Sequence, residues 1–194
     1  MSERESLDRR LTEIVLADPV LMRILRTCRD ADLPDWRLVS GAVYQTVWNV
    51  LTDRPRGFGI RDYDVAYFDA DDLSYEAEDM RIRKLSRDMS DLAPLVELRN
   101  QARVHLWFEQ RFGRPYPPLA STDESLIRYL SPTHAVAVRL ERDDRLDIAA
   151  PFGLEDIFSM IIRPNRLRTD AGQYDEKARR MKETWPELTI HPWS

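Results

Sequence analysis

Apolar residues recur at helical spacing near the start of the chain. Asp18-Pro19 follows this stripe, and an aspartate before a proline is typical of a helix start. The carboxylate accepts hydrogen bonds from the first turn, and proline has a backbone angle suited to it. Two helices are therefore expected within residues 1–33. The stripe consists of Leu7, Leu11, Ile14 and Val15.

Short apolar runs then alternate with longer segments of helical periodicity, and two apolar runs flank Asp143-Asp144 as a hairpin. This order predicts an α+β (mixed α/β) fold in which helices pack on a small mixed sheet. The expected strands are residues 36–39, 63–68, 95–98, 135–140 and 146–149. The expected later helices begin after Gly41, after an Asp69–Asp72 cap, at Val104, after Ser121, at Leu154 (to Ile162) and at Asp175 (to Trp185).

Composition describes a globular protein, since 43% of the 194 residues are hydrophobic and 32% are charged. The net charge of −5 argues against a nucleic-acid partner, because such binding depends on a positive surface. Cys28 is the only cysteine, which excludes an internal disulfide and a thiolate metal cage. No apolar run is long enough to cross a membrane, and the first residues lack an apolar signal core. We therefore expect a soluble, cytoplasmic protein.

Two acids stand at alternate positions at the start of an expected strand. Asp62 and Asp64 project from the same face, because alternate strand residues do so. Carboxylates that close repel each other, and a hard divalent cation such as Mg²⁺ or Mn²⁺ relieves the repulsion. The same pattern also occurs on solvated strand edges, so it does not define a metal site alone.

The segment Ser40-Gly41-Ala42 lies between an expected strand and an expected helix. A glycine there lets the backbone approach a ligand, and the start of the helix offers N–H groups to phosphate. An ordinary strand-to-helix turn has the same appearance.

The order of the two features resembles the nucleotidyltransferase superfamily, in which a Gly-Gly or Gly-Ser turn precedes an Asp-x-Asp strand. This chain departs from that signature in having Ala42 at the second turn position and an inserted loop at residues 54–59. Three longer segments resemble a bacterial family of uncharacterised nucleotidyltransferase-like proteins. They are Arg61 to Asp69, Arg99 to Trp107, and Ala150 to Asp156 together with Arg163-Pro164-Asn165.

The resemblance implies one nucleotidyltransferase-like domain over residues 1–194, with N-terminal helices at 1–33, a catalytic core at 34–165 and a helical tail at 166–194. It implies a third carboxylate on a neighbouring strand, for which Glu97 and Asp147 are candidates, and we favour Glu97 as the third metal ligand. It also implies roles for the polar residues that follow. We expect Arg103 and His105 to act in catalysis, and the nucleotide to be bound by Ser40, Gly41, Ala42, Asn49, Arg99, Asn100 and Gln101.

The implied reaction is metal-dependent transfer of a nucleoside monophosphate from ATP or another nucleoside triphosphate to a hydroxyl acceptor, with release of pyrophosphate. The acceptor would be a small molecule or a protein, and neither a membrane nor a nucleic acid is expected as partner. The alternatives are a non-catalytic nucleotide-binding module and a toxin–antitoxin-like module that binds a partner chain. Ala42 favours the former, and apolar tail residues (Met181, Trp185 and Trp193) favour the latter. No pattern specifies the base, the acceptor or the oligomeric state.

Overall fold

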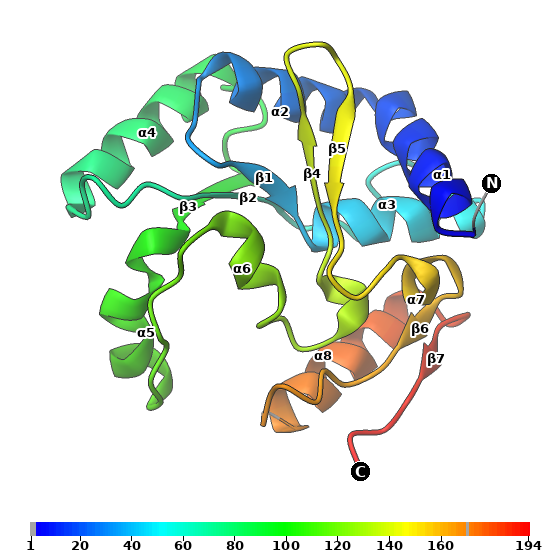
Figure 1. Ribbon diagram of the computed structural model, residues 1–194. Coiled ribbons are helices and arrows are strands. Elements are labelled where there is room, and N and C mark those ends of the chain that lie inside the picture. Colours follow the sequence, from blue (N-terminus) through cyan, green and yellow to red (C-terminus); the bar gives the residue numbers. More distant parts are fainter. Residues whose placement is uncertain (1–2, 170) are drawn as a thin grey trace.

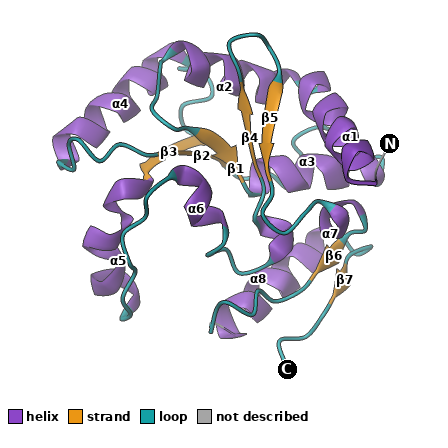
Figure 2. Ribbon diagram, viewed as in Figure 1, coloured by secondary structure: helices purple, strands orange, loops and turns teal. Residues whose placement is uncertain are grey.

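The computed structural model describes residues 3–169 and 171–194, which form a five-stranded mixed sheet covered by helices (Figures 1 and 2). The strand order is β3-β2-β1-β4-β5, in which only β2 and β3 run parallel. This architecture confirms the predicted α+β fold. The strands are β1 (Arg37–Val39), β2 (Tyr63–Tyr67), β3 (Val96–Asn100), β4 (Ala137–Leu140) and β5 (Leu146–Ala149).

Helices α1 to α4 cover one face of the sheet, and their apolar residues form the main core with it. Asp18 caps α2 as predicted, because its Oδ1 accepts hydrogen bonds from the N–H groups of Val20 and Leu21. Helix α6 lies on the other face, where Leu126 packs in a smaller core. The helices are α1 (Glu3–Ala17), α2 (Pro19–Asp30), α3 (Gly41–Leu51), α4 (Tyr75–Asp88), α5 (Val104–Phe112), α6 (Thr122–Leu126), α7 (Glu155–Phe158) and α8 (Ala171–Thr184), with 3-10 turns η1 (Gln101–Arg103) and η2 (Pro132–His134).

Helix α4 begins later than expected. Its N-cap is Ser74, whose hydroxyl accepts from the N–H of Ala77 at 3.2 Å. The Asp69–Asp72 segment does not cap the helix. Asp69 instead bonds the buried Asn100 through its backbone, and its carboxylate pairs with Arg81.

The prediction of a helix from Leu154 to Ile162 is wrong after Phe158, where α7 ends. The backbone of Met160 has φ 53°, which interrupts the helical path. Ile161–Ile162 then forms strand β6, which pairs in parallel with β7 (Thr189–Ile190) from the end of the chain. Apolar periodicity could not reveal this pairing, because the partner strand lies far along the sequence.

The C-terminal tail is part of the main core, so two of the three apolar tail residues that were expected to face a partner are buried. Met181 and Trp185 are buried, and the indole of Trp185 donates a 3.0 Å hydrogen bond to Asn49. The inserted 54–59 loop packs against the same indole. A side chain at Gly59, where φ is +72°, would place its Cβ 2.6 Å from Trp185. Within residues 3–169 and 171–194, no helix is both long and apolar enough to span a bilayer.

Candidate active site

Two acids from adjacent parallel strands lie side by side. Asp64 on β2 is the register partner of Glu97 on β3, so both side chains project from the same face of the sheet. Asp62 lies two residues before Asp64, at the entrance to β2, and is exposed. The structure therefore brings together the three carboxylates that the sequence favoured.

Burial and mutual repulsion disfavour the ionised form of the carboxylates at this site when no cation is bound. Burial, together with the negative charges of Asp62 and Glu97, raises the pKa of Asp64 to about 6, while Lys177 and Arg99 act in the opposite direction. A cation with oxygen ligands would offset this repulsion, so the donor set suits a divalent metal. Among the described residues, however, no group of three His, Cys, Asp or Glu side chains is already arranged to hold an ion.

Asp147, the alternative third acid, lies elsewhere in the sheet. It is on β5, which β1 and β4 separate from β2. Its carboxylate accepts a 2.6 Å hydrogen bond from the buried guanidinium of Arg37, which also binds Asp123 of α6. Asp147 therefore helps to attach α6 to the sheet, and it is not a neighbour of Asp64.

The turn between β1 and α3 lies next to the carboxylates. Because β1 is antiparallel to β2, the end of β1 is beside the start of β2. Ser40 has φ 54° and ψ −115°, a conformation rare for residues with a side chain, and its side chain does not cap α3. At Gly41 an added Cβ would lie 2.9 Å from the amide nitrogen of Gln45, whereas Ala42 is buried. Strain at such a turn is typical of ligand-binding sites. The N–H groups of Val43 and Tyr44 bond the carbonyl of Ser40, so the amides that could face a ligand here are those of Gly41 and Ala42.

The fold uses two of the amides that were expected to bind nucleotide. Asn49 donates to the carbonyl of Phe58 and accepts from Trp185. Asn100 is buried and bonds the backbone of Asp69 and Ala102. Neither amide is available to a ligand, so this part of the prediction is corrected. Gln101 and Arg99, in contrast, line a cavity of about 330 Å³.

Arg103 is also engaged within the fold. It forms an ion pair with Glu78 of α4 and donates to the carbonyl of Leu73 at 2.9 Å. These contacts attach α4 to the end of β3, and the catalytic role of Arg103 stays a prediction. His105 lies in the first turn of α5 and has a buried Nδ1 without a hydrogen-bond partner. Its catalytic role stays a prediction.

Helix α8 adds a cation that the sequence did not single out. Burial, together with the positive charge of Arg180, lowers the pKa of Lys177 to about 8, whereas Asp64 and Asp62 act in the opposite direction. Lys177 thus interacts electrostatically with both carboxylates. No sequence motif marks this lysine, because its helix comes from the end of the chain and lies beside the β6–β7 pair, below the sheet in the view of Figure 1.

Comparison with known proteins agrees with this geometry. A family model described as Nucleotidyltransferase matches residues 26–190. One solved structure, whose title states that it reveals a CCA-adding enzyme head domain, is similar with 28% identity, a TM-score of 0.76 and coverage of 95% of each chain. No curated protein is significantly similar to this chain.

Larger enzymes share the fold at lower identity. An apo CCA-adding enzyme is 13% identical with a TM-score of 0.54, and the match covers 93% of this chain and 42% of that one. A CCA-adding enzyme in complex with CTP is 15% identical with a TM-score of 0.51, covering 98% and 43%. This chain therefore spans less than half of these two enzymes.

The fold and the site define a nucleotidyltransferase-type protein. The chain belongs to the nucleotidyltransferase family whose model it matches over most of its length. Proteins of this family generally use divalent metal ions, which agrees with the set of oxygen donors at Asp62, Asp64 and Glu97.

Proposed function

We propose that this protein is a magnesium- or manganese-dependent nucleotidyltransferase that moves a nucleoside monophosphate from a nucleoside triphosphate to a hydroxyl acceptor. The observation that carries the proposal is the pairing of Asp64 with Glu97 on one sheet face, two residues after Asp62. The burial and mutual repulsion of these acids, which raise the pKa of Asp64, support a cation as their partner.

Asp62, Asp64 and Glu97 would hold the metal, which supplies positive charge to the triphosphate and to the leaving pyrophosphate. Since the N–H of Ser40 donates to the carbonyl of Val136, the N–H groups of Gly41 and Ala42, at the start of α3, would face the terminal phosphates. Lys177 and Arg99 would add positive charge beside them, since both already interact with Asp64. That a fold neighbour is a CCA-adding enzyme in complex with CTP agrees with a triphosphate ligand.

In the proposed reaction, the acceptor oxygen attacks the α-phosphorus and the bond to the bridging oxygen of pyrophosphate breaks. As the alternative to binding the metal, Glu97 would take the proton of the attacking hydroxyl, because it is half exposed and lies beside Asp64. His105 is the alternative proton acceptor. The structural neighbours include tRNA-processing enzymes, so the expectation that nucleic acid is excluded as acceptor has no support.

The test is release of pyrophosphate from each of the four ribonucleoside triphosphates with and without Mg²⁺. Asp64→Asn should lower metal-dependent release at least about hundredfold, because the amide is a poor metal ligand. It should leave the thermal stability unchanged or higher, because it removes a repelled charge. Asp72→Asn, on an exposed loop outside the site, is the matched control. Equal release by wild type and Asp64→Asn would contradict the metal assignment.

The alternative is a nucleotide-binding module without turnover. It is favoured by Ala42, which puts a buried methyl group where the superfamily has glycine or serine, and by the lack of a ready-made three-acid ion site among the described residues. Triphosphate binding by calorimetry, with no pyrophosphate from any tested acceptor, would favour this alternative.

A further inference from the structure

Two cations of helix α8 lie beside the first turn of α3. Lys177 and Arg180 are three residues apart, so they occupy neighbouring positions on one side of the helix. Within the described part of the chain, neither side chain forms an ion pair or a hydrogen bond, whereas the adjacent Arg179 pairs with Glu183 at 3.3 Å. Lys177 and Arg180 therefore keep their donors available for a ligand.

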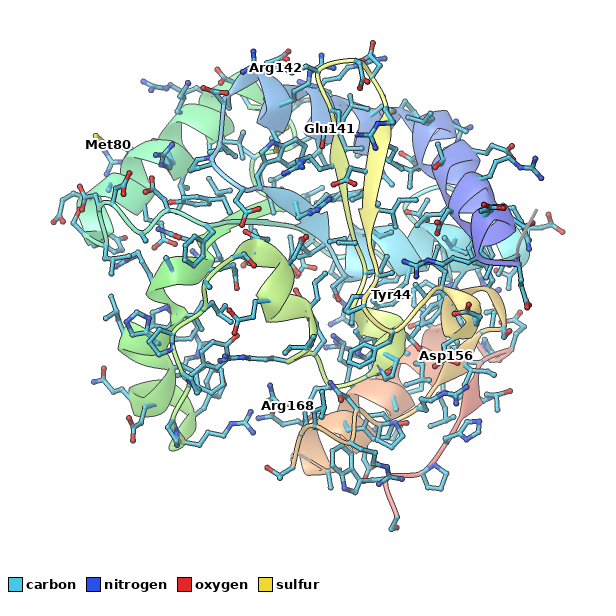
Figure 3. The ribbon with its side chains drawn as sticks, in the orientation of Figure 1. Tyr44, Met80, Glu141, Arg142, Asp156 and Arg168 are labelled. Carbon is cyan, nitrogen blue, oxygen red and sulfur yellow. The ribbon has the colours of Figure 1, made fainter. Side chains whose placement is uncertain are left out.

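The contacts of Tyr44 place α8 against the start of α3. The Tyr44 hydroxyl lies 3.9 Å from the sulfur of Met181, the residue after Arg180, and the Tyr44 side chain lies between the two helices (Figure 3). The ring also packs on His134 at a centroid distance of 5.1 Å. The positive charge of Arg180 lowers the pKa of both Tyr44 and His134, although burial raises that of Tyr44. Arg180 is therefore near the first turn of α3.

Lys177 lies nearer to the proposed metal site. It lines the cavity of about 330 Å³, and its charge interacts with Asp64 and Asp62 without forming an ion pair with either in the described structure. Placing Lys177 and Arg180 together costs free energy, because burial and the charge of Arg180 both lower the pKa of Lys177. An anion bound by the two side chains would offset this cost.

A buried amide with an unpaired oxygen lies at the same turn. Gln45 is only 7% exposed, and its Oε1 has no hydrogen-bond partner among the described residues. Its Nε2 donates to the Tyr44 hydroxyl at 3.5 Å and lies 2.9 Å from where a Cβ would stand at Gly41. The amide therefore packs directly over the glycine that begins α3. Because buried polar atoms are normally paired, Gln45 favours a polar ligand at this turn.

The cations and the turn together suit a chain of phosphates. A triphosphate carries more negative charge than one divalent metal ion neutralises, so it needs further positive groups beside the metal. Lys177 lies beside the carboxylates, and Arg180 lies beside the turn where the N–H groups of Gly41 and Ala42 face outward. A nucleotide whose inner phosphates contact the metal would extend its outermost phosphate toward Arg180.

We propose that Lys177 and Arg180 bind the phosphates of the nucleotide, and that Arg180 makes the site select nucleoside triphosphates over diphosphates by binding the terminal phosphate. The inference rests on the proposed function for the position of the metal. It adds α8, which lies outside the expected catalytic core of residues 34–165, to the substrate site.

The test measures binding of α,β-methylene ATP and α,β-methylene ADP to the full chain by calorimetry with Mg²⁺, since neither analogue can release its terminal phosphates by attack at the α-phosphorus. Wild type should bind the triphosphate at least about tenfold more tightly than the diphosphate. Arg180→Gln should weaken triphosphate binding about tenfold and diphosphate binding much less, so that selectivity is lost. Lys177→Gln should weaken the binding of both analogues, because Lys177 lies beside the carboxylates.

The matched control is Arg179→Gln. Arg179 is the exposed neighbour of Arg180 on a different side of α8, and it should leave both affinities unchanged. Arg180→Gln should melt at the same temperature as wild type, because the side chain is exposed. The proposal is overturned if Arg180→Gln keeps the selectivity of wild type, or if Arg179→Gln weakens triphosphate binding equally.

The same measurements separate this inference from the proposed function. If wild type binds neither analogue, both are contradicted. If pyrophosphate release depends on Asp64 while Arg180→Gln still selects the triphosphate, only the role of Arg180 is removed.

Discussion

Single residues in this protein have roles that depend on where the sheet places them. Glu97 and Asp147 each lie between apolar neighbours in the sequence, and the sequence alone left both as candidates for the third carboxylate. The register of β3 puts Glu97 beside Asp64, whereas the strand order puts Asp147 beside Arg37. Strand order is a property of the whole chain, which is why a local pattern could not separate the two acids.

This difference predicts opposite effects of two matched substitutions. Glu97→Gln should lower metal-dependent pyrophosphate release about tenfold or more without changing stability, since Glu97 is half exposed. Asp147→Asn should retain release but lower the free energy of unfolding by about 1–3 kcal/mol, because buried Arg37 loses one of its two charged partners. Turnover assays and urea unfolding measure the two effects. Loss of release in Asp147→Asn, with release retained in Glu97→Gln, would instead identify Asp147 as the third carboxylate of the metal site.

His134 had no predicted role, yet it is fully buried and neither ring nitrogen has a hydrogen-bond partner. Burial lowers its pKa well below 6.5, and the charges of Lys177 and Arg180 lower it further. Its ring packs against Tyr44 of α3 at a centroid distance of 5.1 Å. The folded protein therefore holds this histidine neutral.

The sign of the pH effect follows from linkage. As pH falls below 6.5 the unfolded chain gains a proton that folded His134 does not, so the folded state loses stability, by at most about 1.4 kcal/mol per pH unit. His134→Leu should remove this part of the slope between pH 6.5 and 4.5, and the same change at exposed His191 should keep it. An unchanged slope in His134→Leu, from urea unfolding at several pH values, would mean that His134 is protonated in the folded protein.

At the level of elements, the sequence predicted helices and strands correctly where neighbouring residues determine their ends. The Asp18 cap and the β4–β5 hairpin both occur where expected. The short β6–β7 pair and the path of α8 depend on contacts between distant segments, so periodicity did not reveal them. The same contacts bring Lys177 to the site and bury Trp185 beside the 54–59 loop.

Helix α8 is held in the core by the Trp185 side chain that follows it, so shortening this side chain should reduce stability. Trp185→Ala should lower the free energy of unfolding by about 3–5 kcal/mol, because it removes a fully buried indole and its hydrogen bond to Asn49. Trp193→Ala is the control, since Trp193 is only partly buried against Tyr174, and it should cost about 1 kcal/mol. Denaturant unfolding compares the two. Equal small losses would show that the tail is not part of the cooperative core.

At the scale of the whole molecule, the distribution of charge matters more than its sum. The net charge of −5 suggested no nucleic-acid partner, but in the folded chain five cations line two adjoining cavities. Two of them, Arg99 and Lys177, interact with Asp64, one of the three acids of the proposed metal site. Sequence motifs indicated the acids, since they lie on adjacent strands near a glycine turn. Arg114, Arg128 and Arg168 come from separate loops and helix ends, so only the folded chain reveals them as one surface.

The central claim is that Asp62 and Asp64 hold a divalent cation against a triphosphate. Anomalous scattering from crystals soaked with Mn²⁺ and a non-hydrolysable triphosphate tests it most directly, because the signal locates the ion independently of any assay. We expect a peak within coordination distance, about 2–2.5 Å, of carboxylate oxygens from both residues, with Glu97 nearby and phosphate oxygens completing the shell. A bound triphosphate with no peak at these carboxylates, or with Mn²⁺ held elsewhere, would contradict it.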